Sequence, residues 1–186
     1  METPTNYIQD ILNSRGGQEK SIRWYQNKIR EFGIPSQKRL LNEGQASTTL
    51  YRGKMNFFVY DPKYRETLPY YDKFPLILPL QVEQAYFIGL NFHYLSIPYR
   101  LQLLEKLQRF RRGTGENEIM KVSWDRVNNF KESNAVVKKY LKNHVRSVFR
   151  EINPDEMLTA ILLPVQSFSK RSIYKVYADS RRMMSI

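Results

Sequence analysis

The sequence has 186 residues, of which 41% are hydrophobic and 26% are charged, and its net charge is +12. This length fits one domain with additional helices, and the hydrophobic share is sufficient for a core. The lack of cysteine excludes disulfides, thiolate nucleophiles and cysteine-ligated zinc. No run approaches the roughly 20 apolar residues of a membrane span, so we expect no membrane partner.

The positive charge is concentrated in the second half of the chain. Residues 1–95 contain 12 Lys or Arg and 9 Asp or Glu, whereas residues 96–186 contain 18 and 9. A basic protein of this kind is suited to contact with a polyanion such as nucleic acid, an acidic protein surface or an anionic membrane. A solvated basic surface that only aids solubility is the alternative.

The first 50 residues are predicted to form two helices and an extended arm. A short helix is expected at 7–12, before the break Gly16-Gly17, and a second at 19–32, where apolar residues recur at helical spacing. Residues 33–50 are polar and without periodicity. A connector this long indicates an arm or a hinge.

The next segment is aromatic and interrupted by prolines, and it predicts a small β-sheet. Strands are expected at 55–60 and 86–94 because aromatic and β-branched residues dominate there, and at 74–80 because Pro75 and Pro79 bracket the apolar run Leu76-Ile77-Leu78. Pro75 and Pro79 predict that the second strand is short or at an edge, since proline donates no ladder hydrogen bond. Gly89 indicates a bulge or a close backbone approach in the third.

The remaining chain is predicted to be mostly helical. Ser96 and Pro98 begin one helix, and a second is expected from about 134 to 149 with a basic stripe beside an apolar one. Asn153-Pro154 predicts a short helix start. Residues 160–163 are expected to form a buried strand, and residues 172–184 a basic helix or tail.

These elements predict an α+β fold. We expect a small curved antiparallel sheet or partial β-barrel with flanking helices and an extended N-terminal arm. The predicted division is residues 1–50, holding the helices and the arm, and residues 51–186, forming a single α+β domain with a basic helical C-terminal half.

The chain carries no recognisable catalytic, cofactor-binding or metal-binding signature. His93 and His144 are expected to be structural, since no partner carboxylate or nucleophile is identifiable for either. Asp61, Glu66 and Asp72 alternate with basic residues, so solvated, salt-bridged turn residues are the favoured interpretation. A hydrolase built on these carboxylates and His93 is the least favoured alternative.

Tyrosines interleaved with cations leave two interpretations open. Rings that stack on bases and cations that meet phosphates are the ingredients of a single-strand nucleic-acid surface. Tyrosine is also common in protein interfaces, because its ring is apolar and its hydroxyl group is polar. We interpret Tyr64, Tyr70 and Tyr71 as protein-interface residues.

Basic residues in the second half are the candidates for nucleic-acid contact. A stripe repeats every four residues along the predicted helix, and two further arginines follow the helix before it. These candidates are Lys138, Lys142, Arg146, Arg150, Arg111 and Arg112.

Several phrases of the sequence resemble a known family. They are Gly-Lys-Met-x-x-Phe-x-Tyr-Asp-Pro-Lys at 53–63, Leu-Pro-Tyr-Tyr-Asp-Lys-Phe-Pro-Leu at 68–76, and Gly-Leu-Asn-Phe-His-Tyr-Leu at 89–95. Lys-Tyr-Leu-Lys-Asn-His-Val at 139–145 and Ala-Asp-Ser-Arg-Arg at 178–182 fit as well. Together they are similar to a family of small basic proteins of T-even-type tailed phages, whose members are labelled DNA end protectors or virion proteins.

The resemblance implies a role in the virion or its assembly. We therefore expect a non-enzymatic structural protein of the DNA-proximal neck, tail or baseplate, made in the host cytoplasm and bound mainly to other virion proteins in a symmetric assembly. DNA is a further possible partner. The alternative is a sequence-nonspecific DNA-binding or DNA-end-protecting protein, acting through its basic residues and tyrosines.

Overall fold

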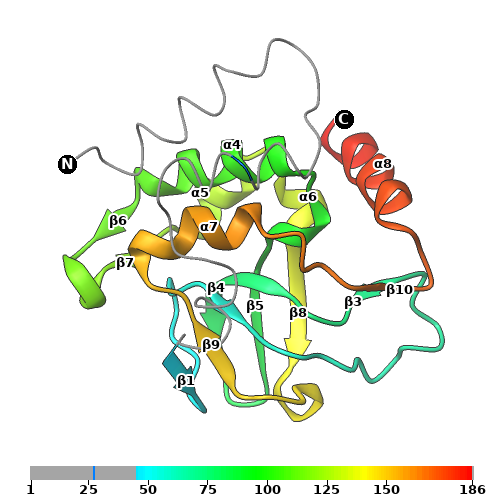
Figure 1. The fold of residues 1–186 in the computed structure, drawn as a ribbon, viewed down its shortest axis with the longest axis horizontal. Coiled ribbons are helices and arrows are strands. Elements are labelled where there is room, and N and C mark those ends of the chain that lie inside the picture. The colour runs from blue at the N-terminus through cyan, green and yellow to red at the C-terminus, as the bar shows by residue number, and fades with distance from the viewer. Residues whose placement is uncertain (1–26, 28–44, 186) are drawn as a thin grey trace.

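The computed structural model describes residue 27 and residues 45–185 (Figure 1). The helix expected at 7–12 lies outside the described residues, and so does the helix expected at 19–32 apart from Asn27, which is helical. So does the expected arm, apart from residues 45–50, which include strand β1. The division at residue 50 stays a prediction.

The principal sheet is antiparallel and six-stranded, in the order β1-β9-β2-β4-β5-β8. Its strands are β1 Gln45–Ser47, β9 Phe149–Glu151, β2 Asn56–Phe57, β4 Leu76–Val82, β5 Tyr86–Asn91 and β8 Val137–Leu141. Two small ribbons lie beside it, β3 Tyr71–Asp72 with β10 Phe168–Ser169 and β6 Arg111–Arg112 with β7 Ile119–Met120. The sheet is open, with β1 and β8 at its edges.

Five α-helices complete the described part of the fold. They are α4 Ile97–Gln108, α5 Trp124–Asn128, α6 Ser133–Val136, α7 Met157–Leu162 and α8 Ile173–Met184. Single 3-10 turns are η1 Phe92–Tyr94, η2 Gly115–Asn117, η3 Lys142–His144 and η4 Pro154–Glu156. Figure 1 shows α4, α5 and α7 together above the sheet, with α8 at one side. The predicted α+β class is confirmed.

The two faces of the sheet bury different apolar groups. Leu76, Leu78 and Leu80 of β4 belong to the larger core with α4 and α7, whereas Ile77 joins a smaller aromatic core. This is the period of two expected for a strand buried on both faces. The smaller core contains Leu50, Phe58, Tyr60, Ile77, Phe87, Tyr140 and Phe149.

Strand β4 corrects the expectation of a short or edge strand. It has seven residues and lies between β2 and β5. The sheet accommodates Pro79 at a register shift, and the Pro79 carbonyl accepts a hydrogen bond from the Gly53 N–H at 2.8 Å. Gly89 lies opposite Pro79, where an added Cβ would come within 2.8 Å of the Leu78 carbonyl oxygen. The expected close approach at Gly89 is therefore confirmed.

The long helix expected at 134–149 is wrong. Helix α6 ends at Val136, and the chain continues as β8, η3 and β9. Apolar spacing in this segment suits a helix, but Val137–Leu141 instead pairs along the whole of β5. Tertiary pairing has overridden a local pattern, and Lys138, Lys142, Arg146 and Arg150 do not share a helix face.

The strand expected at 160–163 is also wrong, because residues 157–162 form helix α7. A short apolar run does not distinguish a buried strand from a buried helix, and every residue of α7 is buried. The helix start predicted at Asn153-Pro154 is correct, because these residues begin η4, which leads directly into α7. The helices expected after Ser96 and Ser172 are confirmed as α4 and α8.

Candidate functional site

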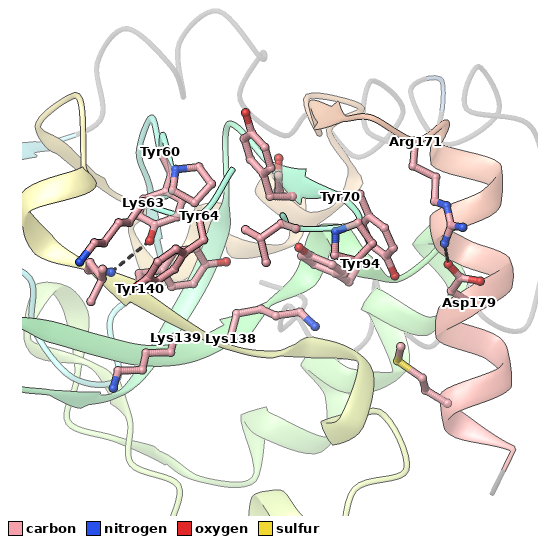
Figure 2. A pocket seen from close by; sticks show the side chains of 17 residues that line it. Tyr60, Lys63, Tyr64, Tyr70, Tyr94, Lys138, Lys139, Tyr140, Arg171 and Asp179 are labelled. Carbon is pink, nitrogen blue, oxygen red and sulfur yellow. Dashed lines mark hydrogen bonds and ion pairs between the residues drawn. The ribbon is translucent and has the colours of Figure 1, made fainter. Parts of the chain in front are cut away.

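An aromatic groove lies beside the edge strand β8 (Figure 2). It has a volume of about 730 Å³ and is bounded by the loop between β2 and β3, by β8 and by α8. Six tyrosines line it: Tyr60, Tyr64, Tyr70, Tyr71, Tyr94 and Tyr140. Four cations also line it, namely Lys63, Lys138, Lys139 and Arg171, with Asp72 and Asp179 as the carboxylates.

The loop that forms one wall is held by local turns and by a distant lysine. The N–H groups of Thr67 and Leu68 donate to the Tyr64 carbonyl at 3.0 Å. Lys170 Nζ donates to the carbonyl oxygens of Glu66 at 2.8 Å and Leu68 at 3.2 Å, and also to that of Arg65. The segment after β10 therefore fixes the shape of this wall.

Tyrosine rings form two groups on either side of the groove. Tyr70 contacts Tyr94 with ring centroids 6.0 Å apart, and both pack on Phe168. Tyr60 and Tyr140 meet edge to face at 4.9 Å on the other side. Tyr64 differs because 61% of its surface is exposed. The groove thus combines fixed rings with one largely exposed ring, that of Tyr64, over which Lys63 Nζ lies 5.3 Å from the centroid.

Cations lie over the tyrosine rings. Lys138 Nζ is 4.2 Å from the Tyr94 centroid, and Lys139 Nζ is 3.9 Å from that of Tyr86. Arg171 lies over Tyr70 at 5.1 Å and pairs with Asp179, as Figure 2 shows. Asp179 also pairs with Arg182. Lys138 and Lys139 thus hold their charges against aromatic faces, whereas Arg171 is already paired with a carboxylate.

Lys138 differs from the other groove cations because it is partly buried and forms no ion pair with a carboxylate among the described residues. Burial lowers the pKa of its amine from 10.5 to about 8. The folded protein therefore loses this proton at lower pH than the unfolded chain does. Between pH 8 and 10.5 the unfolded state binds more protons, so this group makes stability rise with pH.

We expect Lys138→Met to stabilise the protein at pH 7, by roughly 1–3 kcal/mol, because an apolar side chain avoids desolvation of the ammonium. The gain over the wild type should shrink as the pH rises from 7 to 10.5. Urea unfolding of both proteins across this range measures it, with the exposed Lys139→Met as control. A variant that is less stable than the wild type at pH 7 would contradict the assigned desolvation.

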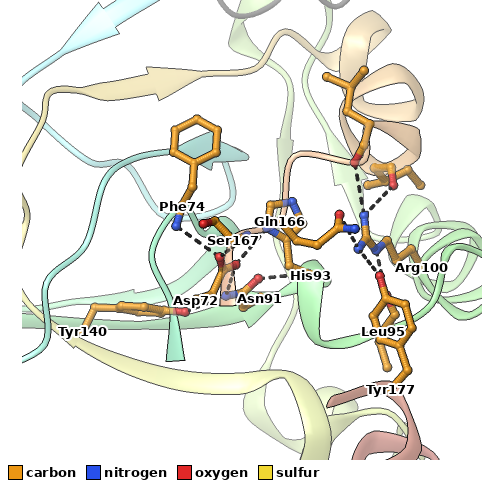
Figure 3. A network of polar contacts seen from close by, with 12 residues as sticks. Asp72, Phe74, Asn91, His93, Leu95, Arg100, Tyr140, Gln166, Ser167 and Tyr177 are labelled. Carbon is orange, nitrogen blue, oxygen red and sulfur yellow. Dashed lines mark hydrogen bonds and ion pairs between the residues drawn. The ribbon is translucent and has the colours of Figure 1, made fainter. Parts of the chain in front are cut away.

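A buried polar network lies beneath the groove and includes two of its lining residues, Asp72 and Tyr140 (Figure 3). Asp72 Oδ2 accepts from His93 Nδ1 at 2.8 Å and from Asn91 Nδ2 at 3.2 Å, and Asn91 Nδ2 also donates to the Tyr140 hydroxyl at 2.9 Å. Asp72 Oδ1 accepts from the backbone N–H groups of Phe74 and Ser167. The network joins four segments of the chain.

Asp72 was expected to be a solvated turn residue, and this is wrong, because it is 2% exposed. It is also the partner carboxylate that sequence reasoning did not find for His93. The His93 ring is fully buried, and burial lowers the pKa of its imidazole despite the adjacent Asp72. A neutral His93 that donates to Asp72 through Nδ1 fits the expected structural role.

The other carboxylates and His144 match their predictions. Asp61 and Glu66 form exposed ion pairs with Arg65. His144 Nδ1 hydrogen-bonds the Asp61 carbonyl at 2.8 Å, although it lies in η3 rather than on a helix stripe.

The groove brings together some predicted site residues and leaves others apart. All three tyrosines interpreted as interface residues, Tyr64, Tyr70 and Tyr71, line it, together with Lys138. Lys142 and Arg146 line a second hollow of about 640 Å³ near η3.

The remaining predicted cations lie elsewhere. Arg150 is on β9, opposite Ala46 and Phe57. Arg111 and Arg112 lie on β6, where Arg111 pairs with Glu118.

Sequence reasoning missed Lys139 and Arg171 as groove cations. Lys139 directly follows the predicted Lys138, but in a helix it would have lain off the basic stripe. Arg171 reaches the groove from the start of α8, a neighbourhood set by the pairing of β10 with β3. Within residues 45–185, no three His, Cys, Asp or Glu side chains are grouped to hold a metal, and no helix is long and apolar enough to cross a membrane.

The fold and the groove define a small basic α+β protein with an aromatic, net cationic binding groove. The chain belongs to the family of the phage T4 terminal DNA protecting protein, whose family model matches residues 6–183. No curated protein and no solved structure matched the chain. The family resemblance expected from the sequence is thereby confirmed, and it favours the DNA-end-protecting alternative over a purely structural role.

Proposed function

We propose that this protein binds the ends of linear DNA without catalysis and shields them. The observation that carries the proposal is the groove, where six tyrosines and four cations meet only two carboxylates. Asp179 is occupied by Arg171 and Arg182, and Asp72 by its own buried network. The family's description as a terminal DNA protecting protein supports this use of the groove.

Binding through the groove should be strongly dependent on salt. Each phosphate neutralised by a lysine or arginine contributes about −0.9 to the slope of log K against log salt for duplex DNA. The three groove cations that form no ion pair among the described residues, Lys63, Lys138 and Lys139, correspond to a slope of about −2 to −3 if each contacts a phosphate. Lys138→Met should reduce the slope by about one.

The test compares a labelled linear duplex with the same duplex closed by hairpin loops at both ends. We expect the full-length protein to bind the open duplex at least about tenfold more tightly, measured by fluorescence anisotropy, and to slow its digestion by an exonuclease. Arg126→Ala is the matched control, because Arg126 is exposed on α5 and lies outside the groove. Equal affinity for open and closed duplexes would contradict end binding.

A place in the phage particle, at the neck, tail or baseplate, is a second proposal. The exposed apolar side chains Val59 and Val148 favour it, since Val148 lines the second hollow and Val59 is linked to the same segment through Ser147. Such side chains are suited to contact with another particle protein. Mass spectrometry of purified particles should detect the chain, and its absence would contradict residence in the virion.

A further inference from the structure

The size of the groove separates two kinds of DNA ligand. A hollow of about 730 Å³ falls within the range of about 300–1,000 Å³ that encloses small molecules. A hollow of this size suits a small ligand such as one unpaired nucleotide. An unpaired end is therefore the DNA ligand that the groove fits best.

The rings of the groove suit an unpaired base. Single-strand binding proteins stack bases on aromatic side chains without regard to sequence. Tyr64 offers an accessible ring on one side, and Tyr70 is fixed by Tyr94 and Phe168 on the other. A base entering between these two sides meets aromatic surface in both directions (Figure 2).

The floor of the groove suits a phosphate. Lys138 lies beneath the rings, close to Tyr94, and no carboxylate among the described residues neutralises it. A partly buried ammonium without a counterion is costly unless a ligand supplies the negative charge. Arg171 at the end of the groove is already paired with Asp179. Lys138 is the partly buried groove cation that still lacks a negatively charged partner among the described residues.

Helix α8 closes one side of the groove, which favours the end of a DNA strand over its interior. Its Asp179 and Met183 line the groove together with the adjacent Arg171, and Figure 2 shows the helix standing across one side. A strand that enters from the opposite side meets this helix. The terminal nucleotide is the part of a strand that fits such a position.

We propose that the groove holds the unpaired terminal nucleotide of a DNA strand, with its base against Tyr64 and Tyr70 and its phosphate on Lys138. The inference rests on the proposed function and narrows its ligand from a DNA end to an unpaired end. The protein would then recognise a frayed or extended terminus by filling the groove with it.

The test uses the full-length protein and duplexes closed by a hairpin at one end. The other end is blunt, extended by two nucleotides on the 3′ strand, or extended on the 5′ strand with and without a terminal phosphate. A duplex closed at both ends that contains a two-nucleotide internal bubble completes the set. We expect at least one extended end to bind about tenfold more tightly than the blunt end and the bubble.

Two variants test whether the preference for extended over blunt ends arises in the groove. Tyr64→Leu leaves the fold intact because the ring is exposed, and Lys138→Met retains the volume of the side chain. Each should reduce the extended-to-blunt ratio to about threefold or less, whereas Arg126→Ala should leave it unchanged. The tyrosine effect follows from a stacking contribution of about tenfold for each base.

The outcomes distinguish this inference from the proposed function. If open ends bind more tightly than closed ones but blunt and extended ends bind equally, end binding stands and the unpaired nucleotide is excluded. If the bubble matches the extended ends, the groove does not select a terminus. If both groove variants keep the full ratio, the nucleotide lies elsewhere and the groove serves another ligand, such as a protein segment.

Discussion

Replacing Arg100 with methionine is expected to lower the free energy of unfolding by about 3–5 kcal/mol. Arg100 lies on α4, is fully buried, and donates five hydrogen bonds (Figure 3). Their acceptors are the carbonyl oxygens of Leu95, Ile161 and Leu163, the Gln166 side chain and the Tyr177 hydroxyl. Methionine fills the space but leaves these acceptors buried without their donor.

The size of the effect follows from what Arg100 joins. Its guanidinium connects α4 to the end of α7, to the following segment and to α8, and none of its five acceptors is a carboxylate. Burial lowers the pKa of the guanidinium, which nevertheless stays charged near neutral pH. All five hydrogen bonds to the charge therefore end on neutral oxygens, and each lost bond leaves one of these oxygens buried without a donor.

Urea unfolding followed by circular dichroism measures the change, with Arg109→Ala as the control. Arg109 is exposed at the C-terminal end of the same helix, so its removal should change stability by no more than about 0.5 kcal/mol. Arg100→Lys should fall between the two because it keeps a charge but has fewer donors. A loss below about 1 kcal/mol for Arg100→Met would show that the neighbouring groups find other partners.

Local signals predicted the elements that carry a start signal or an apolar composition of their own. Ser96 with Pro98 marked the start of α4, Ser172 marked that of α8, an apolar run marked β4 and aromatic composition marked β5. These signals failed where a distant segment decided the conformation. Val137–Leu141 is a strand because β5 provides a partner along its whole length, and no short-range pattern carries that information.

The candidate site also combines residues that local sequence could indicate with residues that only the fold brings together. Tyr64, Tyr70 and Tyr71 could be singled out because tyrosines interleaved with lysine and arginine in the sequence are typical of binding surfaces. The two readings left open for them, nucleic-acid contact and protein contact, depend on their surroundings. The structure supplies those surroundings by placing β8 and the start of α8 against their loop, which adds Lys138, Lys139 and Arg171.

Asp72→Ala is expected to lower the free energy of unfolding by about 3–5 kcal/mol, although the sequence presents Asp72 as an ordinary charged turn residue. Its carboxylate accepts from His93, Asn91 and two backbone N–H groups, which would all lose an acceptor inside the protein. Asp72→Asn should lower the free energy of unfolding by about 1–3 kcal/mol, because the NH₂ group of asparagine would lie opposite a donor at the position where a carboxylate oxygen accepts. Chemical unfolding of both variants gives these values.

Asp61→Ala is the matched control, since Asp61 forms exposed ion pairs and should contribute no more than about 1 kcal/mol. A loss for Asp72→Ala within 1 kcal/mol of that control would contradict the structural role of the network.

The network also bears on the groove, because Asp72 and Tyr140 belong to both. If the network sets the groove floor, Asp72→Asn should also weaken binding of a DNA end under conditions where the variant remains folded. A folded Asp72→Asn protein with unchanged affinity would show that the network stabilises the fold without shaping the groove.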